Sequence, residues 1–227
     1  MQRRDFSALA AFAALAGTGA AARAADGLSN ADAASGIRAA LERGASAAVE
    51  LLGKPDGFLG NPKVRIELPG FLKDAAKVLK FTGQQKRVDD LVTAMNRAAE
   101  AAVPEAKALL VSAVKLMSVS DARGIVAGGQ DSVTKFFASK TRTPLGERFL
   151  PIVKRETAKV DLAERFNAVA GKAAGMGLVK GDDANIERYV TGKALDGLYV
   201  MIGEEEKKIR SDPVGTGSAI LAKVFGR

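Results

Sequence analysis

Apolar residues recur at every third or fourth position along most of the chain, the spacing of an α-helix with one buried face. The clearest case is segment 30–52, where one stripe is formed by Ala33, Ile37, Leu41, Ala48, Leu51 and Leu52. Gly53 followed by Pro55 ends this helix. Gly44 lies within the stripe, where a glycine costs about 1 kcal/mol of helix propensity. We interpret Gly44 as a point of close approach for another helix.

The same spacing predicts further helices over most of the remaining chain. They are expected at 70–81, 84–103, 104–117, 131–139, 144–160, 162–175, 184–210 and 218–225. A short helix that Ser120 or Asp121 caps is expected to end at Gly128. Short linkers favour antiparallel neighbours, so the pattern predicts an all-α fold, an irregular antiparallel bundle of about 7–9 helices.

One stretch, 53–69, does not follow the helical period. It contains the turn sequences Lys-Pro-Asp-Gly and Gly-Asn-Pro. Residues 64–68 then alternate in polarity like a short strand, but no second alternating run offers a partner. We expect an extended segment that lies on the helices.

The first residues, 1–24, have the pattern of a cleavable export signal. A basic start is followed by an uncharged run rich in Ala and Leu, and a small-x-small site predicts cleavage after Ala24. The run is short and interrupted by Gly, which favours a signal over a membrane span. Arg3, Arg4 and Phe6 resemble the twin-arginine motif, although an ordinary secretory signal with two arginines remains the alternative. The protein is therefore expected to be exported to the periplasm.

The remaining chain, 25–227, has the size of a single helical domain. It has no Cys, His or Trp, which excludes disulfides, thiolate nucleophiles and His-based catalysis and removes the usual zinc ligands. We therefore predict no metal site and no cofactor. The 34 Lys and Arg exceed the 26 Asp and Glu, giving a net charge of +8, but the two signs are interleaved. We expect no nucleic-acid partner and at most a peripheral contact with an anionic membrane.

Several separated motifs carry a resemblance to a known family. They lie at 28–36, 52–59, 95–107, 121–125, 193–198, 204–210 and 223–226. In these motifs the chain resembles a bacterial family of unknown function, DUF 4197, over nearly all of its length after the signal. The resemblance implies an exported, mainly helical protein, and it implies no reaction, cofactor or partner.

A carboxylate on the last long helix is the one catalytic candidate. The apolar face of segment 184–210 contains Ile186, Val190, Ala194, Gly197, Leu198, Met201 and Ile202. Helical projection at about 100° per residue puts Glu205 near the middle of this face, with Glu204 and Glu206 on its flanks. Glu205 could serve as a general acid or base or bind a ligand. Alternatively, the helix could run past the core into solvent at this point, or Glu205 could form a structural ion pair with Arg65, Arg97 or Arg123.

The candidate binding residues fall mainly in or near the non-helical stretch. They are Lys54, Asp56, Asn61, Arg65, Asn96, Arg97 and Arg123. The stretch could clamp an anion or a peptide, or it could be a packed connector. Asn96 lies on the shoulder of a buried stripe and could instead bond a backbone group. Arg97 is spaced to pair with Glu100 in solvent.

Three functions are consistent with this sequence. We favour a non-enzymatic module that binds an envelope protein, a peptide or a small apolar molecule between its helices. The alternatives are an enzyme that uses Glu205, and a peripheral envelope protein attracted to anionic membrane surfaces. The lack of His weakens the case for an enzyme.

Overall fold

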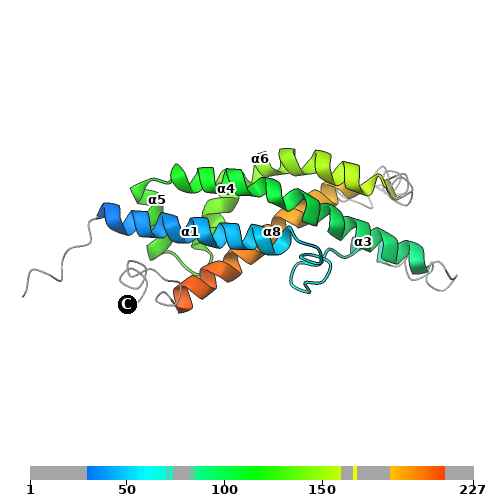
Figure 1. The fold of residues 1–227 in the computed structure, drawn as a ribbon, viewed down its shortest axis with the longest axis horizontal. Coiled ribbons are helices and arrows are strands. Elements are labelled where there is room, and N and C mark those ends of the chain that lie inside the picture. The colour runs from blue at the N-terminus through cyan, green and yellow to red at the C-terminus, as the bar shows by residue number, and fades with distance from the viewer. Residues whose placement is uncertain are drawn as a thin grey trace, which may run out of the picture.

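The chain forms an elongated bundle of helices (Figure 1). The structure is a computed structural model, and it describes residues 30–70, 72–73, 83, 85–159, 166–167 and 185–212. The helices are α1 (Asn30–Leu52), α3 (Gln85–Ala102), the 3-10 helix η1 (Val103–Glu105), α4 (Ala106–Lys115), α5 (Val119–Ala127), α6 (Ser132–Thr157) and α8 (Ile186–Ser211). No strand occurs within the described ranges, which confirms the all-α class.

Several predictions fall on parts of the chain that the structure does not describe. The signal at 1–24 and the helix at 218–225 lie outside the described residues, as does nearly all of 162–175 and most of 70–81. The number of about 7–9 helices therefore stays a prediction. None of the helices in the described part of the chain is long and apolar enough to cross a membrane.

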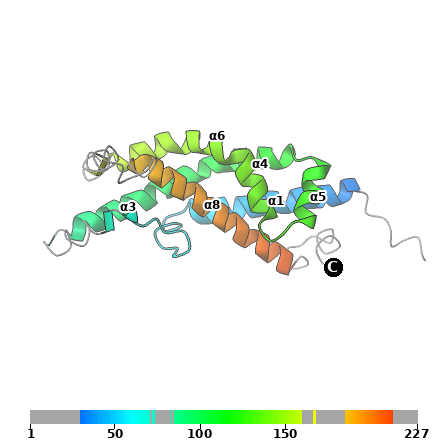
Figure 2. The same ribbon diagram turned by 180° about the vertical axis from the view of Figure 1, so that it is seen from behind.

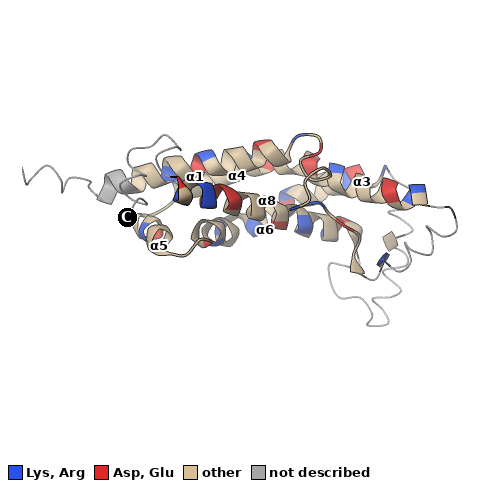
Figure 3. Ribbon diagram, turned by 90° about the horizontal axis from the view of Figure 1, so that it is seen from below, with Lys and Arg blue, Asp and Glu red and all other residues tan. Residues whose placement is uncertain are grey.

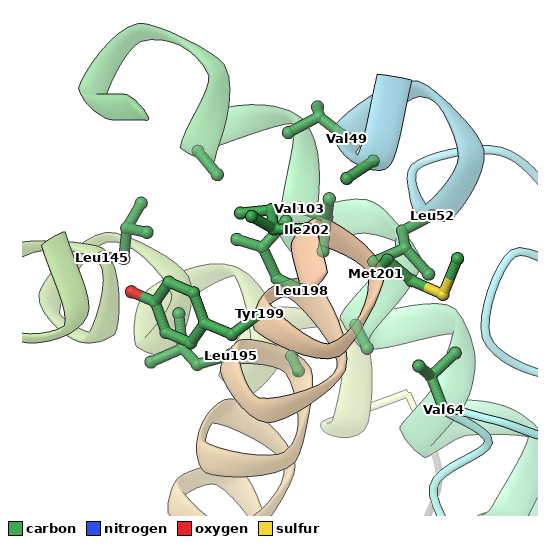
Figure 4. Packing of buried hydrophobic residues seen from close by; sticks show 14 of the residues in the cluster. Val49, Leu52, Val64, Val103, Leu145, Leu195, Leu198, Tyr199, Met201 and Ile202 are labelled. Carbon is green, nitrogen blue, oxygen red and sulfur yellow. The ribbon is translucent and has the colours of Figure 1, made fainter. Parts of the chain in front are cut away.

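Helix α8 joins the other helices into one core. It crosses the bundle diagonally, passing behind α1 in Figure 1 and in front of it in Figure 2, and it packs against α1, α3 and α6. Figure 4 shows Leu198 and Ile202 of α8 beside Val103 in the interior. All three side chains are fully buried or nearly so. Burial of this kind stabilises a protein by about 1.5–3 kcal/mol per large apolar side chain.

Helices α6 and α8 both bury every fourth residue. In α6 the row is Val133, Phe137, Thr141, Leu145, Phe149, Val153 and Thr157. In α8 it includes Ile186, Val190, Ala194, Leu198, Ile202 and Glu206. When two such rows interlock, the helices cross at about −50°. This packing agrees with the diagonal course of α8.

The prediction of two helices at 131–139 and 144–160 is wrong, because α6 is one helix. Pro144 and Pro151 both lie inside it, and each removes a backbone bond at a cost of about 3 kcal/mol. The buried row continues across Pro144, with Phe137 and Leu145 both fully buried. Tertiary packing on both sides therefore outweighs the local preference to stop.

The predicted cap of the short helix α5 is also wrong, because the cap is Ser118. Its hydroxyl accepts a hydrogen bond from the backbone N–H of Asp121 (3.0 Å), and its own N–H donates to the Asp121 carboxylate (3.0 Å). This reciprocal pair is a capping box with an aspartate in the third helical position. It starts the helix two residues earlier than Ser120 would.

The predicted close approach at Gly44 is confirmed. A Cβ atom on Gly44 would lie 3.5 Å from Cβ of Glu205 and 3.5 Å from Cδ1 of Ile209. Helix α8 therefore lies against α1 at Gly44, at a distance where an added Cβ would be in ordinary van der Waals contact.

The stretch between α1 and α3 is non-helical up to residue 69, as the sequence predicts. It begins with tight turns, in which the N–H of Gly57 donates to the carbonyl of Lys54 (2.9 Å). Asp56 takes a positive φ of 65° in this turn, a conformation that Asp tolerates better than most residues. Residues 65–69 form neither helix nor turn. Ile66 directs its N–H and its carbonyl to the same side, toward Asn96, as a residue of an extended chain does. This order of turns and extended chain sets the geometry of the candidate site.

Candidate binding site along the 53–70 segment

A buried carboxylate on α3 holds the first half of the non-helical segment. Oε1 of Glu100 accepts hydrogen bonds from the backbone N–H groups of Phe58 and Leu59, both at 3.0 Å. Oε2 pairs with Arg97 at 2.6 Å, and Arg97 also bonds Asp56 at 2.9 Å. The hydrogen bond with Glu100 is the main reason that the pKa of Arg97 is raised. Glu100 and Arg97 of α3 therefore hold the turn together, Glu100 through backbone N–H groups and Arg97 through the Asp56 side chain.

A fully buried amide on the same helix holds the second half. Oδ1 of Asn96 accepts from the N–H of Ile66 (2.8 Å), and Nδ2 donates to the carbonyl of Ile66 (2.9 Å). The same Nδ2 also donates to the carbonyl of Val92 within α3 (2.8 Å). Asn96 thus gives a buried, unpaired piece of extended chain the two bonds that a neighbouring strand would supply.

The other predicted binding residues are only partly brought together. Arg65 bonds the carboxylate of Glu67 (2.9 Å) and the carbonyl of Leu59 (2.8 Å). Asn61 accepts from the N–H of Lys63 (3.2 Å). Lys54 is exposed in the turn, and Arg123 is exposed on α5, which lies at one end of the bundle, away from this turn (Figure 1). These residues do not form one binding cluster.

An open groove of about 400 Å³ lies between the extended segment and α8. Its charged lining consists of Lys63, Arg65, Glu67, Lys73, Lys193 and Asp196. Four of these are cations and two are acids, so the lining is net positive. Tyr189 and Val200 of α8 also line the groove, and Val200 is 44% exposed. This volume falls within the range of ligand sites, about 300–1,000 Å³, but the groove is open and its lining is more polar than that of most small-molecule pockets.

The buried carboxylate of α8 is Glu206, which sequence reasoning placed on a flank. Its side chain is 1% exposed and pairs with Arg210 at 2.9 Å. It also accepts hydrogen bonds from the N–H groups of Val133 (3.2 Å) and Thr134 (3.4 Å) at the start of α6. Glu206 therefore serves α6 as a cap that its own Asp131 does not provide.

The catalytic candidate Glu205 lies beside this pair, at the rim of the core. Its side chain is 19% exposed and bonds Lys208 at 2.6 Å. The apolar cavity next to it, between α1, α6 and α8, is about 20 Å³, which is room for about one water molecule. Within the described residues no group of three or more acidic side chains is placed to hold a metal ion.

Sequence reasoning also missed the burial of Glu100. The expected pairing of Arg97 with Glu100 is present, but Glu100 is 4% exposed rather than solvated. For Glu100, the available signal was its position next to Ala99 in a helix rich in buried alanine. For Glu206, the signal was the row of every fourth residue on α8, which continues from Ile202 to Glu206.

A comparison with family models found one that spans nearly the whole chain. The model described as "Protein of unknown function (DUF4197)" matches residues 27–226. Searches of curated proteins and of solved structures found no match.

Proposed function

Because the chain belongs to the DUF4197 family, whose description gives no function, we propose a function from the geometry of the structure. The protein is an exported, non-enzymatic module, and it binds a partner along the groove between residues 63–73 and α8. The groove itself is the observation that carries the proposal. It combines an opening of about 400 Å³ with charged side chains and one exposed apolar residue, Val200.

The buried polar side chains hold the fold together and offer no group for catalysis. Asn96, Glu100 and Glu206 are buried, and each is bonded to backbone groups of another segment. A general acid or base must instead reach a substrate directly. Glu205 already bonds Lys208, and the cavity beside it holds about one water. No observation favours the enzyme as a second candidate.

The charge distribution gives little support to attachment at a membrane surface. In the view of Figure 3, Lys and Arg alternate with Asp and Glu along the helices rather than gathering on one face. Attraction to anionic lipid grows with the number of cations held near the surface. Interleaved acids reduce this attraction, so the groove is the better-supported contact.

Export is part of the same proposal and has its own test. Residues 1–24 act as a cleaved signal, so N-terminal sequencing of the periplasmic protein should begin at Ala25. Replacing Arg3 and Arg4 by lysines blocks secretion if the twin-arginine route is used. Secretion that continues after this change assigns the general route, and a protein that keeps Met1 in the cytoplasm contradicts export.

Site-specific crosslinking tests the groove. The natural chain has no cysteine, so Val200→Cys introduces a unique attachment point for a benzophenone maleimide. Leu116→Cys is the matched control, because Leu116 is 83% exposed and lies outside the groove. After incubation with envelope extract and illumination, we expect a discrete adduct from Val200→Cys that Leu116→Cys does not form. Equal adducts at both positions, or none at Val200→Cys, would contradict binding in the groove.

A further inference from the structure

The extended segment has one backbone edge that faces the groove. Successive residues of an extended chain point their backbone groups to opposite edges. Ile66 points its N–H and carbonyl to Asn96 of α3, so the corresponding groups of Glu67 point the other way. The hydroxyl of Tyr189 on α8 donates to the carbonyl of Glu67 (2.9 Å), which places this edge beside α8.

Two backbone groups of that edge are unused. Among the residues that the structure describes, neither the N–H of Glu67 nor the carbonyl of Arg65 has a hydrogen-bond partner. One residue of an incoming chain can bond both, with its N–H donating to Arg65 and its carbonyl accepting from Glu67. This is the bonding pattern of a parallel strand pair. An exposed edge of this kind is a template for strand addition.

The side chains around the edge select the charge of the incoming chain. Lys63 and Arg65 already pair with acids of this protein, Glu204 and Glu67. Lys193 lies 3.9 Å from Asp196, at the limit of an ion pair, and its Nζ lies 5.8 Å from the centre of the Tyr189 ring. Lys73 is exposed. Lys193 and Lys73 can therefore pair with acidic groups of an incoming chain at the backbone edge of residues 65–67.

We propose that the edge at residues 65–67 binds an extended, acidic peptide segment of a partner protein, aligned parallel to it. The peptide adds the two missing backbone bonds, and its acidic side chains reach Lys73 and Lys193. This inference rests on the proposed function, because it names the chemistry of the partner in the same groove. Backbone pairing supplies affinity and the lysines supply the preference for acid.

Fluorescence anisotropy with a labelled octapeptide of alternating Asp and Val tests the proposal, with an octapeptide of alternating Lys and Val as the charge control. The critical variant is Glu67→Pro, which removes the unused N–H. Ile66 is already extended, as the residue before a proline must be. Glu67→Ala is the matched control, because it removes the same side chain and keeps the N–H. We expect Glu67→Pro to weaken binding of the acidic peptide at least tenfold and Glu67→Ala to leave it unchanged or slightly tighter.

A second measurement on the unaltered protein keeps the test independent of whether Glu67→Pro folds. An acidic octapeptide in which every amide is N-methylated lacks the donor for Arg65 and should bind at least tenfold more weakly. Lys73→Gln and Lys193→Gln together should weaken the unmodified acidic peptide severalfold and reduce its salt dependence.

Three results would overturn the strand model. They are equal binding by the Glu67→Pro and Glu67→Ala variants in their folded states, equal binding of the methylated peptide, and equal binding of the basic octapeptide. Competition by phosphatidylglycerol vesicles as strong as that by the unlabelled acidic peptide would mean that the lysines only attract anions. If these tests fail while Val200→Cys still gives its specific adduct, the groove binds a partner of another chemistry. If the peptide tests fail and Val200→Cys also gives no specific adduct, the proposed function itself is contradicted.

Discussion

The ring of Phe58 occupies the space that a side chain at Gly197 would need. A Cβ atom on Gly197 would lie 2.6 Å from Cε1 of Phe58 and 3.2 Å from Cζ. Phe58 is fully buried, and Glu100 holds its backbone N–H. The turn can therefore insert an aromatic side chain against α8 only because that helix has no side chain at this position.

Replacing Gly197 by alanine should destabilise the protein by about 1–3 kcal/mol, the cost of overpacking a filled core. Gly192→Ala is the control on the same helix, because nothing lies within 4 Å of its Cβ position. That change should stabilise the protein by about 0.5–1 kcal/mol through helix propensity. Urea unfolding of both variants measures the difference. A Gly197→Ala variant as stable as Gly192→Ala would show that Phe58 does not pack as described.

Asn96→Leu should cost about 2–4 kcal/mol of unfolding free energy. The leucine is of similar size, but it leaves both the N–H and the carbonyl of Ile66 buried without a partner. Thr93→Ala on the exposed side of α3 should change stability by less than about 0.5 kcal/mol. Hydrogen exchange at the Ile66 amide, measured on both variants, locates the effect. Unchanged exchange in Asn96→Leu would argue against the two-way bond.

Glu206→Ala should cost about 3–5 kcal/mol, because it leaves Arg210 largely buried beside the uncapped start of α6. Glu205→Ala removes a partner only from Lys208, whose side chain is 66% exposed, and should cost less than about 1 kcal/mol. Thermal and urea unfolding compare the two neighbours directly. Equal losses of stability in the two variants would contradict the burial of Glu206 and the solvent contact of Glu205.

The ion pairs of Glu204 should make stability depend on pH in strongly acidic solution. Hydrogen bonds from Lys207 and Lys63 lower the pKa of Glu204 from 4.5 to about 2. The folded state therefore holds this proton less tightly than the unfolded state. The stabilisation is complete above about pH 4.5 and is lost as the pH falls through about 2.

The comparison of the unaltered protein with Glu204→Gln isolates this contribution. The gap in unfolding midpoint between the two should be largest at neutral pH, should narrow below pH 4.5 and should vanish near pH 2. It should also shrink in high salt, because the pairs are exposed to solvent. A gap that stays constant from pH 7 to pH 2 would contradict the pairing.

The helices at the two ends of the described chain follow directly from the spacing of apolar residues. The expected ranges 30–52 and 184–210 correspond to α1 and α8 within two residues at each end. The non-helical stretch from 53 to 69 and the close approach at Gly44 were also predicted correctly. These features depend on local geometry, which a periodic pattern expresses fully.

The candidate site was less accessible from the sequence, because its bonds join distant segments. Asn96 and Ile66 are 30 residues apart, and the donors that Glu206 satisfies lie more than 70 residues before it. A projection of α8 alone placed Glu205 at the centre of the buried face, because it had no information on where α1 and α6 lie.

The residue pattern was enough to predict a helical chain and the bounds of α1 and α8, and the composition was enough to exclude disulfide and histidine chemistry. The packing of distant segments determines that α6 continues through Pro144, that Glu206 rather than Glu205 is buried, and that the edge of Glu67 faces a groove. The two kinds of feature differ because the helical period is a property of neighbouring residues. The burial of a carboxylate or the pairing of a backbone group depends instead on which distant segment packs against it.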